Sequence, residues 1–196
     1  MLFAGLGTWT VALIALFGDL IRSRWNRPDL TVELISDAGE PQPQIIRWQD
    51  EAGTTRQRTR EARYYRLRIT NRNRRGPAHE VHVVVESMTR PGPGGGEPII
   101  ELRGPIPLRW EHAEAFPAVR NVGSPVIADL LAVTSDRTLA VQTSPATRDY
   151  VLGADLFITV VARSLERESA PVQIRAVWDG GCETEMRHHL RLTRVN

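Results

Sequence analysis

A thiol, two imidazoles and two carboxylates lie within eight residues near the C-terminus and could form a nucleophilic or metal-binding site: Cys182, Glu183, Glu185, His188 and His189. Zinc sites need three or four ligands at recognised spacings, and the chain has a single cysteine. In a strand, the adjacent His188 and His189 would point to opposite faces. The pattern therefore favours neither catalysis nor a metal, and we predict a protein that is not an enzyme and holds no cofactor.

A second histidine pair, His79 and His82, has the same weakness as a metal site. The two side chains would face opposite ways in a strand, and their spacing is one residue short of the helical His-Glu-x-x-His zinc motif. The glycine run at 94–96 lacks the Lys-Ser/Thr that follows in a phosphate-binding loop. We interpret it as an ordinary loop.

The basic stretch between residues 56 and 75 is the third candidate. Its arginines are Arg56, Arg58, Arg60, Arg63, Arg66, Arg68, Arg72, Arg74 and Arg75. It could be a solvated strand face balanced by Glu80 and Glu86, a surface for anionic lipid, or a contact with nucleic acid or another acidic partner. We favour the solvated face. A face for an anionic partner would consist of Arg66, Arg68, Arg72, Arg74 and Arg75. The formal net charge of +2 argues against nucleic acid as the partner.

The composition adds two constraints. All 25 basic residues are arginine, which a GC-rich coding bias would produce and which favours bidentate pairing with carboxylates and phosphates. The lone Cys182 excludes an intrachain disulfide and suits a reducing compartment.

The N-terminus predicts a membrane anchor. Residues 1–18 carry no charged side chain, and as a helix they would span about 27 Å, close to the hydrocarbon core of a bilayer. Continuation to residue 21 adds the remaining length, so we expect a transmembrane helix over 1–21. A basic flank over 22–28 follows, with Arg22, Arg24, Trp25 and Arg27. By the positive-inside rule, this flank places the N-terminus outside and the rest of the chain in the cytoplasm.

Two alternatives compete with the anchor. A cleaved signal peptide would begin with basic residues and end in a small-x-small site, but the segment before Gly18 has neither feature. A buried core helix would show a polar stripe, and this segment offers only Thr8 and Thr10. The anchor fits better than either.

The remainder of the chain has the pattern of strands separated by turns. Apolar residues alternate with polar ones around residues 30–34, 64–70, 81–85, 156–160, 172–178 and 190–192. In the clearest strand, 64–70, Tyr65, Leu67 and Ile69 would share the inner face and Arg66 would point outward. The turn after Asn71 predicts that 64–70 and 81–85 are adjacent antiparallel strands. Residues 37–62 are polar, and we expect only a short strand there, near residues 45–48. Residues 129–133 predict a short strand or a helical turn.

This pattern predicts an all-β fold. Seven or eight short strands, with no second long helical pattern, indicate a two-sheet antiparallel sandwich rather than a parallel α/β sheet. The absence of a cysteine pair excludes an antibody-type domain but not the wider immunoglobulin-like group. We therefore expect the transmembrane helix over 1–21, the flank over 22–28 and one immunoglobulin-like β-sandwich over 29–196.

A local motif supports this fold. Residues 64–71, YYRLRITN, followed by Ala78–Val83, resemble bacterial immunoglobulin-like sandwich domains, including CARDB-type adhesion-related modules. The wider layout resembles uncharacterised bacterial membrane-anchored proteins through its segments 17–28, 107–110 and 150–178. The resemblance implies a fold and lends no activity.

These observations predict a non-enzymatic module that is tethered to the cell inner membrane. We expect it to engage a protein partner at the cytoplasmic surface. One alternative is an accessory subunit that senses anionic lipid with its arginine-rich face. Another is an extracytoplasmic adhesion-type sandwich, if the N-terminus directs export.

Overall fold

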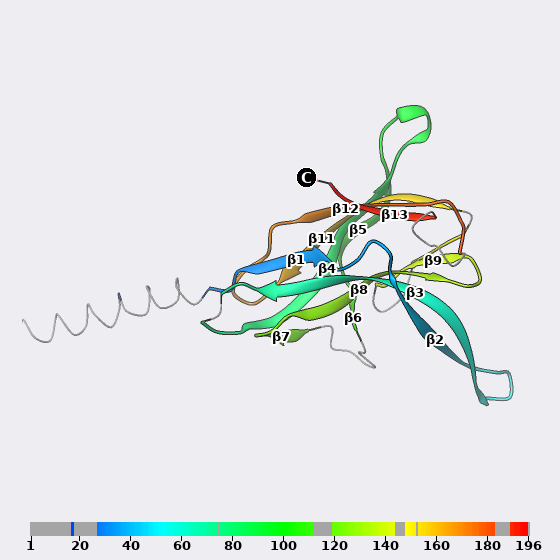
Figure 1. Ribbon diagram of the computed structural model, residues 1–196, viewed down its shortest axis with the longest axis horizontal. Coiled ribbons are helices and arrows are strands. Elements are labelled where there is room, and N and C mark those ends of the chain that lie inside the picture. The colour runs from blue at the N-terminus through cyan, green and yellow to red at the C-terminus, as the bar shows by residue number, and fades with distance from the viewer. Residues whose placement is uncertain are drawn as a thin grey trace, which may run out of the picture.

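The protein is a sandwich of two antiparallel sheets (Figure 1). The computed structural model describes residue 17 and residues 27–73, 75–111, 119–143, 148–151, 153–182 and 189–195. The first sheet contains β1 (Leu30–Leu34), β2 (Glu40–Gln49), β3 (Thr55–Asn71), β6 (Arg109–Trp110), β8 (Val126–Thr134), β9 (Thr138–Val141) and β10 (Arg148–Val151). The second contains β4 (Ala78–Arg90), β5 (Ile99–Pro107), β7 (Arg120–Val122), β11 (Ala154–Arg163), β12 (Val172–Trp178) and β13 (Leu190–Val195). A single 3₁₀ turn, η1 (Pro93–Gly95), lies between β4 and β5. The predicted all-β sandwich is confirmed at this level.

The core forms where the inner faces of the two sheets meet. Tyr65, Leu67 and Ile69 of β3 are fully buried, as their alternation predicts. From the second sheet, alternate residues of β4, β11 and β12 are buried: Val81, Val83, Val85, Leu156, Ile158, Val160, Val172, Ile174, Ala176 and Trp178. Burying each large apolar side chain contributes about 1.5–3 kcal/mol, so this alternation is the main source of stability.

The predicted hairpin between 64–70 and 81–85 is wrong. β3 and β4 belong to different sheets, and residues 72–77 carry the chain from one layer to the other. In the first sheet, β3 pairs with β1 and β2 on one side and with β8 on the other, in the register Leu67↔Ala128. A six-residue loop can join two neighbouring strands or cross the ~10 Å between packed sheets, so loop length alone does not distinguish the two arrangements.

The described residues form thirteen strands instead of the expected seven or eight, partly because β6, β7, β9 and β10 are too short to show a pattern. The larger error concerns residues 37–62, where two long strands form a hairpin instead of a loop with one short strand. The ten residues of β2 pair with the first ten of β3, from Glu40↔Tyr64 to Gln49↔Thr55. Residues 129–133, predicted as strand or helical turn, form part of β8.

β3 runs the whole length of the molecule and has two unlike halves. Its last ten residues, 62–71, pair with β8 on one side and with β1 and the start of β2 on the other. Its first residues pair only with β2, and this hairpin projects beyond the sandwich (Figure 1). The end of β3 at Asn71 lies beside Leu30, where the chain joins the sandwich. With a rise of ~3.3 Å per residue, the two ends of β3 are about 50 Å apart.

The expected transmembrane helix over 1–21 and most of its flank lie outside the described residues. Of residues 1–26 only Phe17 lies within the described part of the chain. Among the described residues, no helix has the length and apolar character needed to cross a bilayer.

Candidate binding surface

The described residues of the predicted anionic-partner face differ in their exposure. Arg66 is buried, with 3% of its side chain exposed, and its predicted outward, solvated position is wrong. Arg68 is exposed on the outer face of β3, as expected. Arg72 and Arg75 are exposed in the loop after β3. Arg74 lies outside the described residues, as do the flank residues Arg22, Arg24 and Trp25; Arg27 is described and exposed. These residues do not form one continuous face around Arg66.

Arg66 is buried because several strands of the first sheet converge around it. Its Nε donates to Asp129 Oδ1 of β8 at 2.8 Å, and its Nη2 donates to Gln42 Oε1 of β2 at 2.6 Å. Its Nη1 pairs with Glu40 and lies 2.9 Å from Glu111 Oε1. The guanidinium also stacks on the ring of Tyr64, 5.4 Å from its centroid. This Arg66 cluster joins the start of β2 to β3, to β8 and to the end of β6.

The electrostatics of the cluster favour a permanently charged guanidinium. Burial by itself would lower the pKa of Arg66, but the hydrogen bond and charge of Asp129, with Glu111 and Glu40, outweigh it and raise that pKa. A buried charge is tolerated only when it is paired and hydrogen-bonded. The cluster is therefore a structural element that fixes the root of the β2–β3 hairpin.

Beyond this root, most of the hairpin side chains whose burial the structure describes are exposed. We call residues 44–60 the arm: the outer parts of β2 and β3 with the turn between them. Residues 55–59 are all exposed, and Ile45 is 55% exposed. An isolated two-stranded hairpin is at best marginally stable in water, because it has no core to cover. Apart from the ion pair of Arg60 with Asp136, no contact between the arm and the sandwich is found among the side chains that the structure describes.

The turn at the tip of the arm is nevertheless well defined. Asp50 Oδ1 accepts hydrogen bonds from the backbone N–H groups of Ala52 (3.1 Å) and Thr54 (2.9 Å), and its Oδ2 accepts one from Arg56 Nε at 2.8 Å. The hydrogen bond from Thr54, followed by the one from Arg56, lowers the pKa of Asp50. Gly53 supplies the left-handed φ of +76°. The arm thus has a fixed tip, although residues 51–55 are exposed.

Three arginines lie at alternate positions on one face of the arm. Arg56, Arg58 and Arg60 share that face because side chains alternate along a strand. Arg60 Nε donates to Gln44 Oε1 at 2.7 Å, and its Nη1 pairs with Asp136 in the β8–β9 turn. Arg58 is exposed and has no ion pair or side-chain hydrogen bond within the described part of the chain. The middle guanidinium of this row is therefore available to a partner.

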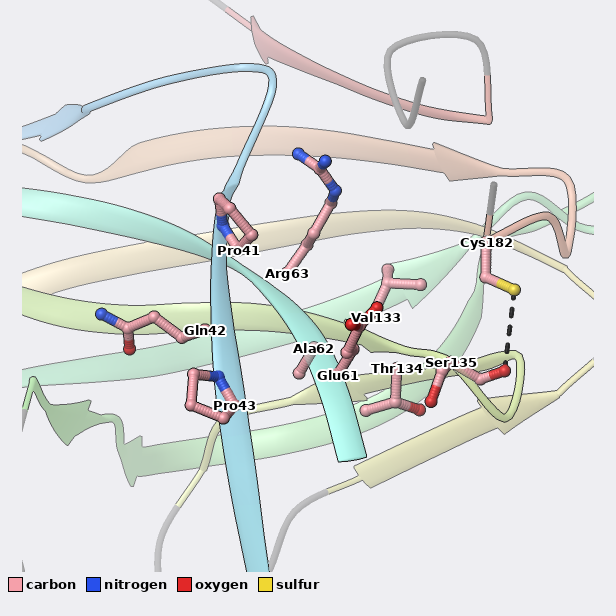
Figure 2. Close-up of a pocket in the computed structure, with 10 residues that line it drawn as sticks. All are labelled: Pro41, Gln42, Pro43, Glu61, Ala62, Arg63, Val133, Thr134, Ser135 and Cys182. Carbon is pink, nitrogen blue, oxygen red and sulfur yellow. Dashed lines mark hydrogen bonds between the residues drawn. The ribbon is translucent and has the colours of Figure 1, made fainter. Parts of the chain in front are cut away.

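A pocket of about 370 Å³ lies at the root of the arm (Figure 2). It is lined by Pro41, Gln42 and Pro43 of β2, Glu61, Ala62 and Arg63 of β3, Val133, Thr134 and Ser135 around the end of β8, and Cys182. Cys182 follows β12 of the second sheet, and its Sγ lies 3.7 Å from the carbonyl oxygen of Ser135. The mixture of apolar and charged walls suits an amphipathic side chain better than a small polar substrate.

Of the C-terminal cluster that could do chemistry, Cys182 and His189 lie among the described residues. Cys182 lines the pocket, whereas Glu183, Glu185 and His188 lie outside the described residues. His189 Nδ1 lies 3.0 Å from Asp179 Oδ2. No group of three or more potential metal ligands occurs among the residues that the structure describes.

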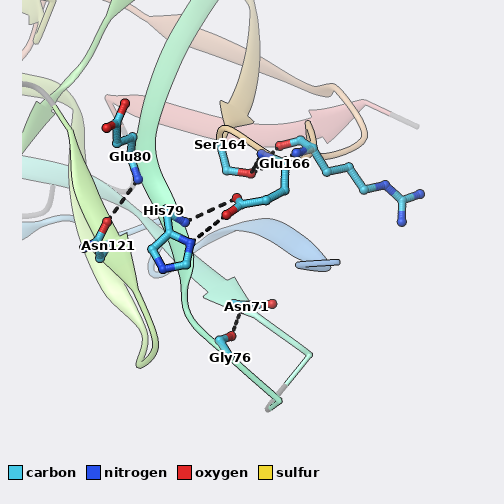
Figure 3. A network of polar contacts seen from close by, with 8 residues as sticks. Asn71, Gly76, His79, Glu80, Asn121, Ser164 and Glu166 are labelled. Carbon is cyan, nitrogen blue, oxygen red and sulfur yellow. Dashed lines mark hydrogen bonds and ion pairs between the residues drawn. The ribbon is translucent and has the colours of Figure 1, made fainter. Parts of the chain in front are cut away.

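His79 lies at the opposite end of the molecule, which we call the near end: residues 27–29, 72–80 and 164–167, where the chain joins the sandwich; His82 follows in β4, opposite Arg163 of β11. There the Nδ1 atom of His79 lies 2.6 Å from Glu166 Oε1, and the backbone N–H of His79 donates to Glu166 Oε2 (Figure 3). Burial acts to raise the pKa of Glu166, but the hydrogen bonds from His79 and Ser164 lower it overall. His82 contacts the carbonyl oxygen of Glu80 instead, at 3.4 Å. The two histidines have different partners and form no common site.

Other polar groups at the near end also have partners. Asn71 Oδ1 accepts the N–H of Asp29 at 3.0 Å, and its Nδ2 donates to the Gly76 carbonyl at 2.9 Å. Glu80 has a left-handed φ of 49°, and its N–H donates to Asn121 Oδ1 (Figure 3). The exposed side chain that stands out here is Leu165, at 69%. Hydrogen bonds at this end join segments that lie far apart in the sequence, such as residues 29 and 71 or 79 and 166.

Comparisons with protein families, with curated proteins and with solved structures found no match to this chain. The candidate site therefore depends on geometry alone. Two sequence signals could have revealed it: prolines at alternate positions 41 and 43, and arginines at alternate positions 56, 58 and 60. Both signals have the period of a strand. Neither consists of the aliphatic or aromatic residues whose alternation marks a half-buried strand, so a search for that pattern misses them.

Proposed function

We propose that this protein is a non-enzymatic, membrane-tethered binding module. In this proposal an immunoglobulin-like sandwich engages a protein partner at the cytoplasmic surface of the cell inner membrane. The arm and the pocket at its root form the recognition surface. The N-terminal segment 1–21 is the transmembrane helix, and the flank with Arg22, Arg24, Trp25 and Arg27 contacts the headgroups.

The observation that carries the binding part of the proposal is the arm itself. Its strands continue past the sandwich, and residues 55–59 are exposed. A buried charge cluster around Arg66 fixes its root, and Asp50 orders its tip. A hairpin with two ordered ends and no core is favoured when a partner supplies the missing contact, because alone it buries too little surface to offset its ordering.

The position of the arm supports the tether. The chain joins the sandwich at residues 27–29, beside the Asn71 end of β3, while the arm ends at the opposite end of the same strand. A helix anchored before residue 27 would hold the arm tip some tens of ångströms from the bilayer, because β3 is about 50 Å long. The arm would then be within reach of a second membrane-associated protein.

The near end favours lipid contact as a secondary role. Leu165 is 69% exposed there, in the same region as exposed Arg27, Arg72 and Arg75. An apolar side chain among arginines is the combination that binds an anionic interface. A polarity-sensitive dye at Leu165→Cys, in a Cys182→Ser background, should shift to the blue in anionic nanodiscs and not in neutral ones. An identical spectrum in both would remove this role.

The binding role is tested by photo-crosslinking in intact cells. A photoreactive residue replaces the exposed Gln57 on the arm, which leaves the arginine row intact, or, as a control, the exposed Arg191 on β13. The proposal predicts a discrete adduct with another protein from position 57, found in the membrane fraction, and none from position 191. Equal adducts from both positions, or no adduct from either, would contradict the binding role.

The tether and its orientation need a separate measurement. Protease added to intact cells should leave the sandwich uncut, and protease added to inverted vesicles should digest it. Cleavage in intact cells would favour the exported, adhesion-type alternative. Full-length protein in the aqueous fraction after cell breakage would refute the anchor.

A further inference from the structure

The arm presents a strand edge that the chain leaves without a neighbour. β8 pairs with β3 as far as Ala62↔Thr134, and Ser135 then donates its N–H to the Glu61 carbonyl at 3.0 Å. At Ser135 the chain turns away into β9. No described strand pairs with residues 55–60 of β3 on that side. Among the described residues, therefore, no strand occupies the position beside the arm that β8 occupies beside the rest of β3.

The main-chain groups on this open side can be identified from the register. Glu61 directs its carbonyl towards β8, and strand residues alternate in direction, so Thr59, Gln57 and Thr55 direct their N–H and C=O groups to the same side. Consistently, Thr54 directs its carbonyl the other way and accepts from Asp50 N–H at 3.0 Å. Three successive donor–acceptor pairs are thus presented to solvent in the spacing of a β-ladder.

The other edge of the hairpin is blocked near the root. In β2 the residues that direct their main chain outward are the odd-numbered ones, since Gln44 and Ile46 pair with the even-numbered Arg60 and Arg58. Pro41 and Pro43 occupy two of these outward positions and remove their donors. Proline on an edge strand discourages addition of another strand. The β3 edge from residue 55 to 61 has no proline.

We propose that an extended, acidic segment of the partner adds as a strand to the free edge of β3, in line with β8. This inference rests on the proposed binding function and names the class of its partner. Its alternate carboxylates would pair with Arg56, Arg58 and Arg60, because both strands repeat their side chains every ~6.6–7 Å on one face. Arg58, which has no side-chain partner among the described residues, is the central contact.

The same row of arginines disfavours a second copy of this chain as the occupant. Two β3 edges paired antiparallel would bring their arginine rows side by side on one face of the sheet. Like charges on facing strands are destabilising. An acidic strand would instead place opposite charges on facing strands. The charge pattern therefore favours an acidic partner over a second copy of this chain.

The test uses the full chain in a neutral detergent and a defined probe, a capped peptide that alternates Glu and Thr over eight residues. Backbone amide exchange followed by NMR should show at least about tenfold slower exchange at Thr55, Gln57 and Thr59 when the peptide is bound. A Lys-Thr peptide of the same length should give no protection. Absence of protection with the acidic peptide overturns the proposal, and so does concentration-dependent protection of these amides without peptide, which would indicate self-association.

Two pairs of variants separate main-chain from side-chain recognition. Gln57→Pro removes a donor from the free edge, and Ile45→Pro removes one from the opposite edge, so only the first should weaken peptide binding, by about five- to tenfold. Arg58→Glu should weaken it by about tenfold or more, whereas the same charge change at Arg191 should have no effect. Equal effects within either pair overturn strand addition at this edge.

The two proposals can fail separately. If photo-crosslinking at position 57 captures a partner while the amides of Thr55, Gln57 and Thr59 stay unprotected in the peptide experiment, the binding role holds and strand addition is wrong. If neither is seen, both are wrong. Protection together with a partner adduct supports both.

Discussion

The two halves of β3 differ in what their side chains contact. Residues 62–71 lie between neighbours on both sides, and Tyr65, Leu67 and Ile69 are fully buried. Residues 55–59 have one neighbouring strand and are exposed on both faces. One strand therefore serves two purposes: its second half contributes to the core, and its first half is ordered by pairing with β2, by turn hydrogen bonds and by ion pairs. Stability and recognition are separated along a single element.

Arg66, at the junction of the two halves, should give the largest effect on substitution. Arg66→Met leaves Asp129, Glu111 and Glu40 without their guanidinium and should lower the free energy of unfolding by about 3–5 kcal/mol. Arg68→Met, on the exposed face two residues on, is the matched control and should stay within about 0.5 kcal/mol. Urea unfolding measures both. Equal losses would mean that Arg66 has no special role at the root.

Two glycines with similar backbone conformations compare the halves directly. Gly39 (φ +66°) precedes β2, and a Cβ there would lie 2.8 Å from Cζ of Tyr65. Gly53 (φ +76°) is at the arm tip, with nothing within 4 Å of such a Cβ. Gly39→Ala should therefore cost about 2–3 kcal/mol and Gly53→Ala about 1 kcal/mol, the cost of left-handed backbone alone. Thermal unfolding of the two variants should show this order, and the reverse order would contradict it.

The buried half should also control stability at alkaline pH. Burial raises the pKa of Tyr65 from 10.0 to about 12, against the smaller opposing effect of Arg63. The folded state therefore resists ionisation of Tyr65 more than the unfolded state does, so stability is intact below pH 10 and decreases as pH rises towards 12. The loss over this range should be about 2 kcal/mol. The chain has no lysine, so few other groups titrate there.

Tyr65→Phe tests this effect. The hydroxyl of Tyr65 is buried with no hydrogen-bond partner in the described part of the chain, so its removal at neutral pH should be neutral or slightly stabilising. The decrease between pH 10 and 12 should become shallower than in the unmodified chain. An unchanged alkaline profile would show that Tyr65 does not titrate with folding.

Shortening the arm should have the smallest effect on stability. Replacement of residues 45–59 by Asn-Gly joins Gln44 to Arg60 through a two-residue turn and keeps the root and the pocket residues. Because residues 55–59 are all exposed, the free energy of unfolding should change by less than about 1 kcal/mol. A loss of several kcal/mol would mean that the arm supports the sandwich.

The alternation of apolar and polar residues predicted which strand residues would be buried. The alternation of Val81, Val83 and Val85, or of Leu156, Ile158 and Val160, results from two sheets sharing one core, and these residues are buried as expected. The partners of each strand did not follow, because the inner face of β3 is equally apolar beside β8 or opposite β4. Pairing depends on long-range register, which a local period does not encode.

The candidate site could not be predicted in the same way. Arg66 has the alternation of a solvated residue, and its burial depends on side chains far away in sequence, such as Asp129. The arm lacks apolar alternation because it has no core, so its strands resembled a polar loop. The pocket joins residues from β2, β3, β8 and the loop after β12, and no local pattern brings these together.

The most direct test is the mass of the protein solubilised from membranes in mild detergent, with and without the arm. The account predicts that the complete chain runs in a stoichiometric complex with another protein, and that the chain with residues 45–59 replaced by Asn-Gly runs alone while unfolding at nearly the same urea concentration. A shortened chain that keeps the same partner, or a complete chain that runs alone, would contradict the assignment of recognition to the arm.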